Sequence, residues 1–319
     1  MRNEVLSAEA AVLAYLAGMP CEQAAQEHDL TARELKELIR RYTAAGRAAL
    51  SHPPSPWHQF NVEFSDASHS ESTATAYLLP VLCRAQSDKD ATWWFLRKPP
   101  GWRLRILPAA SPTVDPVEEL RTALQTAESA GLVQRWWCSA YEPETTAFGG
   151  ECGMALAHEL HAADSGGIAR LLTEMPFGDE EPSRLLLSLL LMTHLHRAAS
   201  LDLNERGDVW ARVAAQRPAP ELAAATAGAL AAKARVVLTT DTTTLTAADG
   251  LLHRVADWAT DIEEIGARLG AAARSGYLQR GLREVLALHV IFHWNRIGLG
   301  ADQQAAWATA TTDALLGDR

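Results

Sequence analysis

The stretch YEPETTAFGG, from Tyr141 to Gly150, places a phenol, two carboxylates and a Gly-Gly pair within ten residues. A tyrosine hydroxyl can donate or accept one proton, and a carboxylate such as that of Glu142 can accept hydrogen bonds from a substrate. Two successive glycines let a backbone approach a ligand closely. The stretch therefore predicts a site at the junction of a strand and a helix, with Tyr141 as an acid-base group.

Arginines form a second set of candidates. Arg103 and Arg105 in GWRLRIL share one face of a predicted strand, because side chains alternate along a strand. Arg97 lies on the strand before it. Guanidinium groups in a sheet otherwise built of Trp and Leu are costly to bury unless they meet an anion or a carbonyl. Either these arginines bind substrate, or their stems cover tryptophans on a solvated sheet face.

Histidines near the C-terminus form a third set, in HVIFHWNR. His289 and His293 are four residues apart on one side of a predicted helix, and Asn295 and Arg296 follow them. Histidine exchanges protons near neutral pH, and the surrounding apolar residues would shift its pKa. A zinc-protease HExxH motif would need a glutamate at Val290, so the pattern indicates acid-base chemistry without a protease zinc site.

Other catalytic and metal-binding patterns are weak or absent in the sequence. His158 and His161 are three residues apart on a predicted helix, but a pair without a third ligand motif is a weak metal signal. No GxSxG nucleophile, GxGxxG loop or phosphate-binding P-loop occurs. We expect no metal and no cofactor.

The composition is typical of a soluble globular protein. Of 319 residues, 48% are hydrophobic and 21% are charged, and a net charge of −10 argues against a general nucleic-acid binder. The longest apolar run, LLLSLLLM, is too short to cross a bilayer, and no signal peptide is recognisable. The four cysteines form no CxxC pair, which favours reduced thiols and a cytoplasmic location.

Residues 1–50 predict a separate helical extension, which the linker SHPPSP joins to a domain over 56–319. Three predicted helices with a short turn before the third resemble a helix-turn-helix, and Thr31 with Glu34 forms a capping-box pattern. The segment contains six Lys and Arg against seven Asp and Glu, whereas a DNA reader normally has a basic excess. We therefore expect no DNA partner, and we favour a small bundle that packs on the main domain or on a peptide.

The elements between the linker and Tyr141 follow the order strand, helix, strand, strand, helix, strand. The strands are WHQFNVEF, TWWFLRK, GWRLRIL and VQRWWCSAY, and the helices are TATAYLLPVLCRAQ and VEELRTALQTAESAGL. This is the split β-α-β order of a ferredoxin-like sandwich. From about residue 151 the pattern is almost all helix, with helices over 153–165, 182–201, 219–238, 251–276 and 278–299. The predicted class is α+β: a ferredoxin-like portion, a mostly helical C-terminal half and an N-terminal helical extension.

These segments, in this order and spacing, resemble the lantibiotic dehydratase C-terminal (glutamate-elimination) domain family. The resemblance rests on WHQFNVEF, WWFLRK with WRLRI, the YEPETTAFGG–GMALAHELHAADS block and HVIFHWNRIGL. It covers roughly residues 56–319 and is most specific in the tyrosine–GG–DS block. Stand-alone members of the family are thiopeptide-type bacteriocin biosynthesis proteins, and the chain is most similar to the thiopeptide pyridine synthases among them.

The resemblance implies one of two activities. In lanthipeptide dehydratases this domain eliminates glutamate from glutamylated Ser or Thr. In thiopeptide pathways a stand-alone relative joins two dehydroalanines by a formal [4+2] aza-cycloaddition, and loss of water and leader peptide gives the central pyridine. Eliminating members usually have basic residues inside the tyrosine motif, where this chain has Pro143 and Ala147, so we favour the cycloaddition. A third hypothesis is a non-catalytic scaffold that binds the precursor peptide.

The motifs and the resemblance together indicate site residues and a partner. We expect the catalytic residues to be Tyr141, His289, His293, Arg103 and Arg105, with the acting histidine left open. We expect the substrate-binding residues to be Arg97, Trp102, Glu142, Asp164, Ser165, Asn295 and Arg296. The implied partner is a dehydrated, azole-containing precursor peptide with its leader, whose thiazoles would stack on tryptophans. No membrane partner is expected, and a homodimer is compatible with the sequence.

Overall fold

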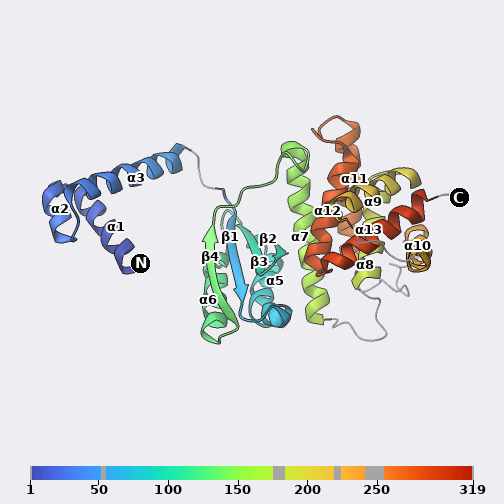
Figure 1. Cartoon of the computed structure of the whole chain (residues 1–319), viewed down its shortest axis with the longest axis horizontal. Coiled ribbons are helices and arrows are strands. Elements are labelled where there is room, and N and C mark those ends of the chain that lie inside the picture. Colours follow the sequence, from blue (N-terminus) through green and yellow to red (C-terminus); the bar gives the residue numbers. More distant parts are fainter. Residues whose placement is uncertain (1, 52–54, 175–183, 219–223, 241–254, 318–319) are drawn as a thin grey trace. The chain divides into compact units, whose positions relative to one another are not determined.

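The computed structural model describes residues 2–51, 55–174, 184–218, 224–240 and 255–317. The chain divides into two compact units, unit 1 from Met1 to Ser55 and unit 2 from Pro56 to Arg319. Unit 1 is helical, and unit 2 combines a four-stranded sheet with helices (Figure 1). Within the described ranges, every helix is too short or too polar to span a membrane.

Unit 1 is a three-helix bundle with a small core of its own. Its helices are α1 (Arg2–Leu16), α2 (Cys21–Glu27) and α3 (Ala32–Ser51). Leu35 of α3 is fully buried against small apolar residues of α1 and α2. The predicted capping box is present: the Thr31 N–H donates to the Glu34 carboxylate (2.9 Å), and the Glu34 N–H donates to the Thr31 hydroxyl (3.2 Å). These bonds fix the start of α3.

Unit 2 begins with the ferredoxin-like portion. Its strands are β1 (His58–Phe64), β2 (Ala91–Lys98), β3 (Gly101–Pro108) and β4 (Val133–Ser139). The strand order is β2-β3-β1-β4, and all neighbours are antiparallel. The connections run through η1 (Ala67–His69), α4 (Ser70–Thr73), η2 (Ala74–Leu78) and α5 (Leu79–Ser87) after β1, and through α6 (Pro116–Ser129) after β3. This topology confirms the predicted α+β class.

Alternation along the strands gives the sheet one apolar and one polar face. Phe60 of β1 and Leu104 of β3 are buried in the main core, on the face covered by α5 and α6 (Figure 1). Their neighbours in sequence, Gln59 and Arg105, point to the opposite face, because successive side chains alternate. The polar face carries the predicted arginine pair Arg103 and Arg105.

The C-terminal half of unit 2 is helical, as predicted. Its helices are α7 (Gly150–Glu174), α8 (Arg184–Ala198), α9 (Leu203–Gln216), α10 (Ala224–Thr239), α11 (Ala256–Arg274), α12 (Leu282–Ile297) and α13 (Ala301–Leu316). The predictions did not include α9 and α13. A capping box of Asp202 and Glu205 begins α9, and this signal is visible in the sequence. Residues 182–183, 219–223 and 251–254 of the predicted helices lie outside the described residues.

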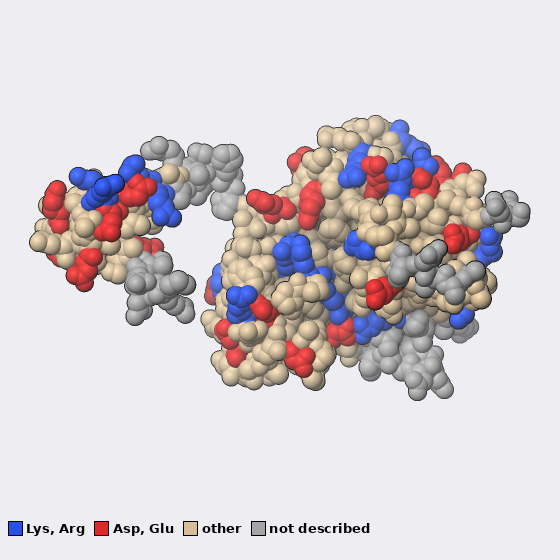
Figure 2. All heavy atoms as spheres, viewed as in Figure 1, with Lys and Arg blue, Asp and Glu red and all other residues tan. Residues whose placement is uncertain are grey.

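Charges of both signs are interspersed on the face of unit 2 shown in Figure 2. Charged residues of unit 2 form ion pairs on its surface; for example, the Arg135 guanidinium lies 2.6 Å from the Glu63 carboxylate. Because exposed pairs contribute little to stability, the fold has to depend on buried contacts instead.

Helix α7 covers the β2 edge of the sheet. The Phe95 N–H of β2 donates to the Ser165 hydroxyl of α7 over 3.1 Å, and Ser165 is fully buried. A side chain thus satisfies a strand donor that would otherwise lack a partner at the sheet edge. Helix α12 packs against both α7 and β2, so these three elements meet beside one another (Figure 1).

A buried carboxylate joins α7 to α12. Asp164 Oδ1 lies 2.8 Å from His293 Nδ1, and Asp164 Oδ2 accepts a hydrogen bond of 2.6 Å from Arg296 Nε. All three side chains are about 1–2% exposed. Burial by itself would raise the pKa of Asp164, but the charges and hydrogen bonds of His293 and Arg296 outweigh it and lower this pKa to about 2. Asp164 is therefore ionised in the folded protein.

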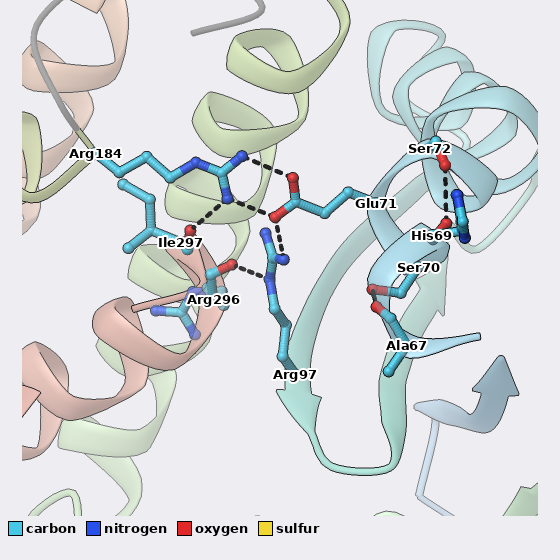
Figure 3. Close-up of polar contacts among 9 residues, drawn as sticks. All are labelled: Ala67, His69, Ser70, Glu71, Ser72, Arg97, Arg184, Arg296 and Ile297. Atoms are coloured by element: carbon cyan, nitrogen blue, oxygen red, sulfur yellow. Dashed lines mark hydrogen bonds and ion pairs between the residues drawn. The ribbon is translucent and has the colours of Figure 1, made fainter. Parts of the chain in front are cut away.

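A second ion-pair network continues from Arg296 towards the sheet (Figure 3). The Arg97 Nε–H of β2 donates to the Arg296 carbonyl over 2.7 Å, and the Arg97 guanidinium also pairs with Glu71 of α4. Arg184 at the start of α8 donates to the same carboxylate (2.7 Å) and to the Ile297 carbonyl (3.3 Å). Two cations thus meet the C-terminal carbonyls of α12, where the helix dipole is negative.

We predict that Asp164→Asn lowers the free energy of unfolding by roughly 3–5 kcal/mol, because it leaves a buried cation uncompensated. The folded-state pKa of Asp164, about 2, lies below its ordinary value of 3.8. The stabilisation is therefore fully present above pH ~4 and is lost as the pH falls towards 2. Urea unfolding at pH 7 and at several lower pH values measures both effects.

Glu159→Gln on the same helix is the matched control. Glu159 pairs with Arg268, but both side chains are about half exposed (46% and 54%). Removing an exposed pair costs about 0–1 kcal/mol. Equal losses of unfolding free energy in the two variants would contradict the stabilising role of Asp164. A difference in unfolding free energy between wild type and Asp164→Asn that does not narrow at low pH would contradict it too.

Candidate active site

Arg105 is the buried cation of the polar sheet face. Its side chain is 3% exposed, and its Nε–H donates to Gln59 Oε1 over 2.8 Å. Gln59 in turn donates through Nε2 to the Ser139 hydroxyl (2.8 Å), which also accepts from Asn61 Nδ2 (2.8 Å). Side chains of β1, β3 and β4 thus form a polar array that fixes the orientation of the Arg105 guanidinium.

Two aromatic rings enclose the same guanidinium. The Arg105 Cζ lies 4.1 Å from the centre of the Trp94 ring and 4.8 Å from the centre of the Tyr141 ring. Burial lowers the pKa of Arg105 to about 10, although the nearby Tyr141 and Glu144 partly oppose this shift. Its buried Nη1 has no hydrogen-bond acceptor among the described residues. Such a group favours an anion or a carbonyl as its partner.

Tyr141 and His158 form a hydrogen-bonded pair beside Arg105. The Tyr141 hydroxyl lies 2.8 Å from His158 Nε2 of α7. Burial raises the pKa of Tyr141 well above its ordinary value, so the phenol is protonated at neutral pH. Burial, and then the Arg105 charge, lower the pKa of His158 to about 4, so the imidazole is neutral. The pair can accept a proton on one group and donate one from the other.

Tryptophans surround this pair. The Trp57 ring lies 4.8 Å from the His158 ring and 6.0 Å from the Tyr141 ring, centre to centre. Trp94 contacts Tyr141 edge-on at 5.9 Å. Trp94, Leu96 and Tyr141 form a separate buried cluster with Trp57 and Phe292. The Tyr141–His158 pair therefore lies in apolar surroundings, which accounts for the direction of both pKa shifts.

His289, a predicted catalytic residue, lies deeper in the core. It is 1% exposed, and its ring centre is 5.6 Å from that of His161 and 5.0 Å from that of Phe148. Burial, followed by the charge of Arg296, lowers the pKa of His289 to about 3. Neither ring nitrogen has a hydrogen-bond partner in the described part of the chain. The structure places His289 behind the site, in an aromatic cluster.

His293, the other predicted catalytic histidine, is the Asp164 partner described above. The structure brings His158, and not His293, to the Tyr141 hydroxyl. The predicted substrate-binding residues Asp164 and Arg296 belong to the same buried triad. Ser165 supports the β2 edge. These four residues position α7 and α12 within the fold.

The remaining predicted residues lie at different places. Arg103 is half-buried on the same sheet face as Arg105, whereas Arg97 and Trp102 pair across β2 and β3 on the opposite face. The Arg97 Cζ lies 4.8 Å from the centre of the Trp102 ring. Asn295 accepts from Gln304 of α13 over 3.0 Å, and Glu142 is exposed. Of the twelve predicted residues, Arg105 and Tyr141 touch each other in the candidate site, and Arg103 shares its sheet face.

The Gly149–Gly150 pair contacts residues 278–280, which lie between α11 and α12. Gly149 and Gly150 both have φ near +89°, a conformation that favours glycine. The Gln279 N–H donates to the Gly149 carbonyl over 2.8 Å, and a Cβ on Gly150 would lie 2.6 Å from Gln279 Cδ. The close approach anticipated for a ligand is made by residues 278–280 in this structure.

The sequence reasoning missed several residues of the site. They are Gln59, Asn61, Trp94, Ser139 and His158. Alternation in WHQFNVEF places Gln59 and Asn61 on one face, and pairing with GWRLRIL would have put them opposite the arginines. His158 offered no such signal, because its role depends on where α7 lies against the sheet.

Comparison with known families identifies the family to which unit 2 belongs. A family described as lantibiotic biosynthesis dehydratase, C-terminal, matches residues 57–315. The chain belongs to this family. Members of the lantibiotic dehydratase family are biosynthetic enzymes that act on ribosomal precursor peptides with a leader. A family described as a helix-turn-helix domain matches residues 9–56.

Solved structures share the fold of this lantibiotic dehydratase-like chain at low identity. The tRNA-dependent lantibiotic dehydratase MibB from Microbispora sp. 107891 has a TM-score of 0.60 and 15% identity, over 82% of this chain and 28% of MibB. TsrL has a TM-score of 0.52 and 16% identity, over 80% of this chain and 93% of TsrL. The pyridine synthase TbtD, from thiomuracin biosynthesis, has a TM-score of 0.51 and 17% identity, over 81% of this chain and 97% of TbtD.

These comparisons differ in how much of each relative they cover. The chain spans little more than a quarter of MibB but nearly all of TsrL and TbtD. Curated protein sequences yield no match. Within the described residues, no cluster of three or more His, Cys, Asp or Glu has the arrangement of a metal site.

We predict that His158 titrates near pH 4 in the native protein and that Arg105→Met raises this midpoint. Burial is the largest cause of the lowered pKa and the Arg105 charge is the next, so the midpoint in the variant stays below the ordinary 6.5. The ring resonances of His158, assigned with His158→Gln, report the midpoint by NMR. Arg135→Met removes an exposed cation elsewhere on the polar face and should leave the midpoint unchanged. A native midpoint near 6.5 would contradict the effects of burial and of the Arg105 charge on the pKa of His158.

Proposed function

We propose that this chain is a cyclase of the lyase type. It forms the central pyridine of a thiopeptide by a formal [4+2] aza-cycloaddition of two dehydroalanines, with loss of water and leader peptide. Its substrate is a dehydrated, azole-containing precursor peptide. The proposal is supported by membership in the lantibiotic dehydratase C-terminal family and by the match over 97% of the pyridine synthase TbtD.

The observation that carries the proposal is the juxtaposition of Arg105 with the Tyr141–His158 pair. Arg105 offers a fixed, desolvated N–H donor without an acceptor among the described residues. Tyr141 and His158 offer a proton donor and a proton acceptor 2.8 Å apart, both uncharged at neutral pH. A peptide amide needs this combination to convert to its imidic-acid tautomer, since its oxygen gains a proton and its nitrogen loses one.

The proposed reaction needs proton transfers and no external oxidant or reductant. One new C–C bond joins the two CH2 carbons of the dehydroalanines, and the other joins the imidic carbon to the second α-carbon. Water then leaves with the former amide oxygen and one ring proton. The leader leaves as an amide with a second ring proton, and the pyridine results. The Tyr141–His158 pair supplies and removes protons, an effect of roughly 10²–10⁴-fold in rate.

The Arg105 guanidinium has a separate role in this mechanism. Its Nη1–H donates to the amide oxygen, where negative charge develops as the amide nitrogen loses its proton. The bond is strong because the donor is charged and shielded from water. Holding both alkenes of one chain in register removes much of the remaining barrier, about 7–11 kcal/mol in favourable intramolecular cases.

The polar sheet face also offers a surface for the azole rings. Trp137 of β4 is 44% exposed and lies opposite Asn61 in the β1–β4 register. The Arg135 Cζ lies 5.0 Å from the centre of the Trp137 ring, so the arginine holds this ring in place. An exposed indole beside the site can stack a thiazole. In this proposal Trp137 is the tryptophan on which a thiazole of the substrate stacks, the role that the sequence analysis gave to tryptophans in general.

Glutamate elimination is the second candidate, and one observation favours it. The unpaired Arg105 Nη1 and the half-buried Arg103 on the same face could together bind the carboxylate of a leaving glutamate. Residues 141–150 contain no Lys or Arg, although Arg280 reaches the Ala147 carbonyl from a neighbouring loop (3.2 Å). Arg280 is already paired with Glu284 (2.6 Å), which is why we rank elimination second.

Mass spectrometry of the purified protein with two substrates separates the candidates. A dehydrated, thiazole-bearing precursor should give a macrocycle and a released leader amide. A glutamylated precursor that loses glutamate would instead support elimination. Binding of either peptide with unchanged mass would overturn both reactions and leave a peptide-binding scaffold.

We predict that Arg105→Gln lowers kcat/KM by more than about 10-fold while the protein stays folded, because the charge-assisted hydrogen bond to substrate is lost. Arg103→Ala should act in the same direction. Arg84→Gln, on α5 and 52% exposed in a surface pair with Glu119, should stay within about 2-fold of wild type. Full activity of both Arg105→Gln and Arg103→Ala would remove the strand arginines from the mechanism.

We predict that Tyr141→Phe and His158→Gln each lower kcat by about 10²-fold or more, the scale of acid-base catalysis. The double variant should lose less than the product of the two effects, because groups that act as a unit are not additive. Tyr277→Phe, 68% exposed on the surface, is the control and should keep wild-type kcat. Wild-type kcat in Tyr141→Phe would make YEPETTAFGG a folding element only.

A further inference from the structure

The candidate active site is closed in this structure. The side chains of Arg105 and Tyr141 are 3% and 4% exposed, and Trp94 beside them is fully buried. The Arg105 Nη1 atom, which lacks an acceptor among the described residues, is buried as well. His158 is half-buried. A ligand can therefore reach these groups only after a neighbouring side chain has moved.

The aromatic rings packed around Tyr141 differ in how firmly the chain holds them. Trp94 belongs to β2, which is hydrogen-bonded along β3, and Phe292 belongs to α12, which the Asp164 carboxylate anchors. Trp57 precedes β1 and lies in neither a strand nor a helix. It is the second residue of unit 2, and the end of a compact unit is the part that moves most easily. Among these rings, Trp57 is the one that can move without breaking a helix or the sheet.

The Trp57 ring covers the Tyr141–His158 pair directly. Its centre lies 4.8 Å from that of His158 and 6.0 Å from that of Tyr141. Rings with centres about 4.5–7 Å apart are in contact, so no ligand fits between the indole and the pair. Trp57 is itself half-buried. It is thus in contact with the pair and partly open to solvent at the same time.

We propose that Trp57 is a positioning residue of the candidate site, whose indole moves aside to admit a peptide amide and then closes over it. The closed indole keeps water from the amide while Arg105 and the Tyr141–His158 pair act on it. Hydrogen bonds from a charged donor are strongest in such a shielded place. The peptide amide as ligand rests on the proposed function, whereas the covering of the pair by Trp57 does not.

The charges around His158 decide what removal of the indole would do. Burial is the largest cause of the lowered pKa of His158, and the Arg105 charge on β3 is the next. Tyr141 is protonated, and His161, three residues further along α7, is neutral because burial lowers its pKa well below the ordinary value. Loss of the Trp57 indole reduces the burial alone. The pKa of His158 should then rise from about 4 and stay below 6.5, because Arg105 remains.

The first test uses the full chain without substrate. Trp57→Ala should raise the NMR midpoint of the His158 ring resonances from near 4 towards 6.5, and Trp57→Phe should restore most of the wild-type midpoint, because it keeps a ring at this place. Diethyl pyrocarbonate, which acylates accessible neutral imidazoles, should modify His158 several-fold faster in Trp57→Ala than in wild type. Peptide mass mapping measures this rate, with the exposed His69 as internal standard.

Trp137→Ala is the matched control. It removes the same side chain from β4, where Trp137 is 44% exposed, and should change neither the midpoint nor the acylation rate of His158. An unchanged midpoint in Trp57→Ala, or equal shifts in Trp57→Ala and Trp137→Ala, would overturn the proposal. Should Trp57→Ala fail to fold, Trp57→Leu decides by the same criteria, since it removes the aromatic cover and keeps an apolar side chain.

A second test uses the dehydrated, thiazole-bearing precursor peptide. Trp57→Ala should lower kcat by more than about 10-fold with a smaller change in KM, because the indole shields the reacting groups after binding. The acidic limb of the pH profile of kcat should move to higher pH with the pKa of His158, which a merely structural role of Trp57 would not cause. If the midpoint shifts but no protein converts the peptide, the proposed reaction fails and the cover stands. An active enzyme with an unchanged midpoint gives the reverse result.

Discussion

The buried carboxylate of Asp164 is the contact on which the arrangement of unit 2 depends. It holds His293 and Arg296 of α12 against α7, and all three side chains are almost fully buried. The next residue, Ser165, accepts the Phe95 N–H at the sheet edge, so one turn of α7 joins the helical half to the sheet. Because His158 lies on the same helix, its distance from Tyr141 depends on this anchoring. A contact outside the candidate site thereby sets the geometry of that site.

Two buried arginines of unit 2 show how a partner decides the role of a cation. Arg296 donates to an ionised carboxylate, so its charge is compensated and it stabilises the packing of α12. Arg105 donates to the neutral Gln59 and lies between two rings, without a carboxylate partner among the described residues. Burial lowers the pKa of both. The uncompensated cation is the one suited to a ligand, because a partner from outside completes its hydrogen bonding.

The fold was largely predictable from the sequence, whereas the site was only partly so. Alternation in WHQFNVEF and GWRLRIL, together with the order of elements, predicted the ferredoxin-like portion. It also placed Arg103 and Arg105 on one face, since strand periodicity is a local property. The partner of Tyr141 was not predictable in this way, because His158, His289 and His293 all lie on helices and only tertiary packing selects among them.

Arg105 and His158 are coupled, and this coupling has a consequence for catalysis under the proposed mechanism. Burial is the main reason why the pKa of His158 is near 4 and the Arg105 charge is the next, and this low pKa makes the free imidazole a weak base. When an amide oxygen on Arg105 gains negative charge, it offsets the field of the guanidinium at His158. The pKa of His158 then rises towards its ordinary value, and the imidazole becomes a stronger proton acceptor as the amide nitrogen loses its proton. The same cation would thus keep His158 uncharged before substrate binds and strengthen it as a base while the reaction proceeds.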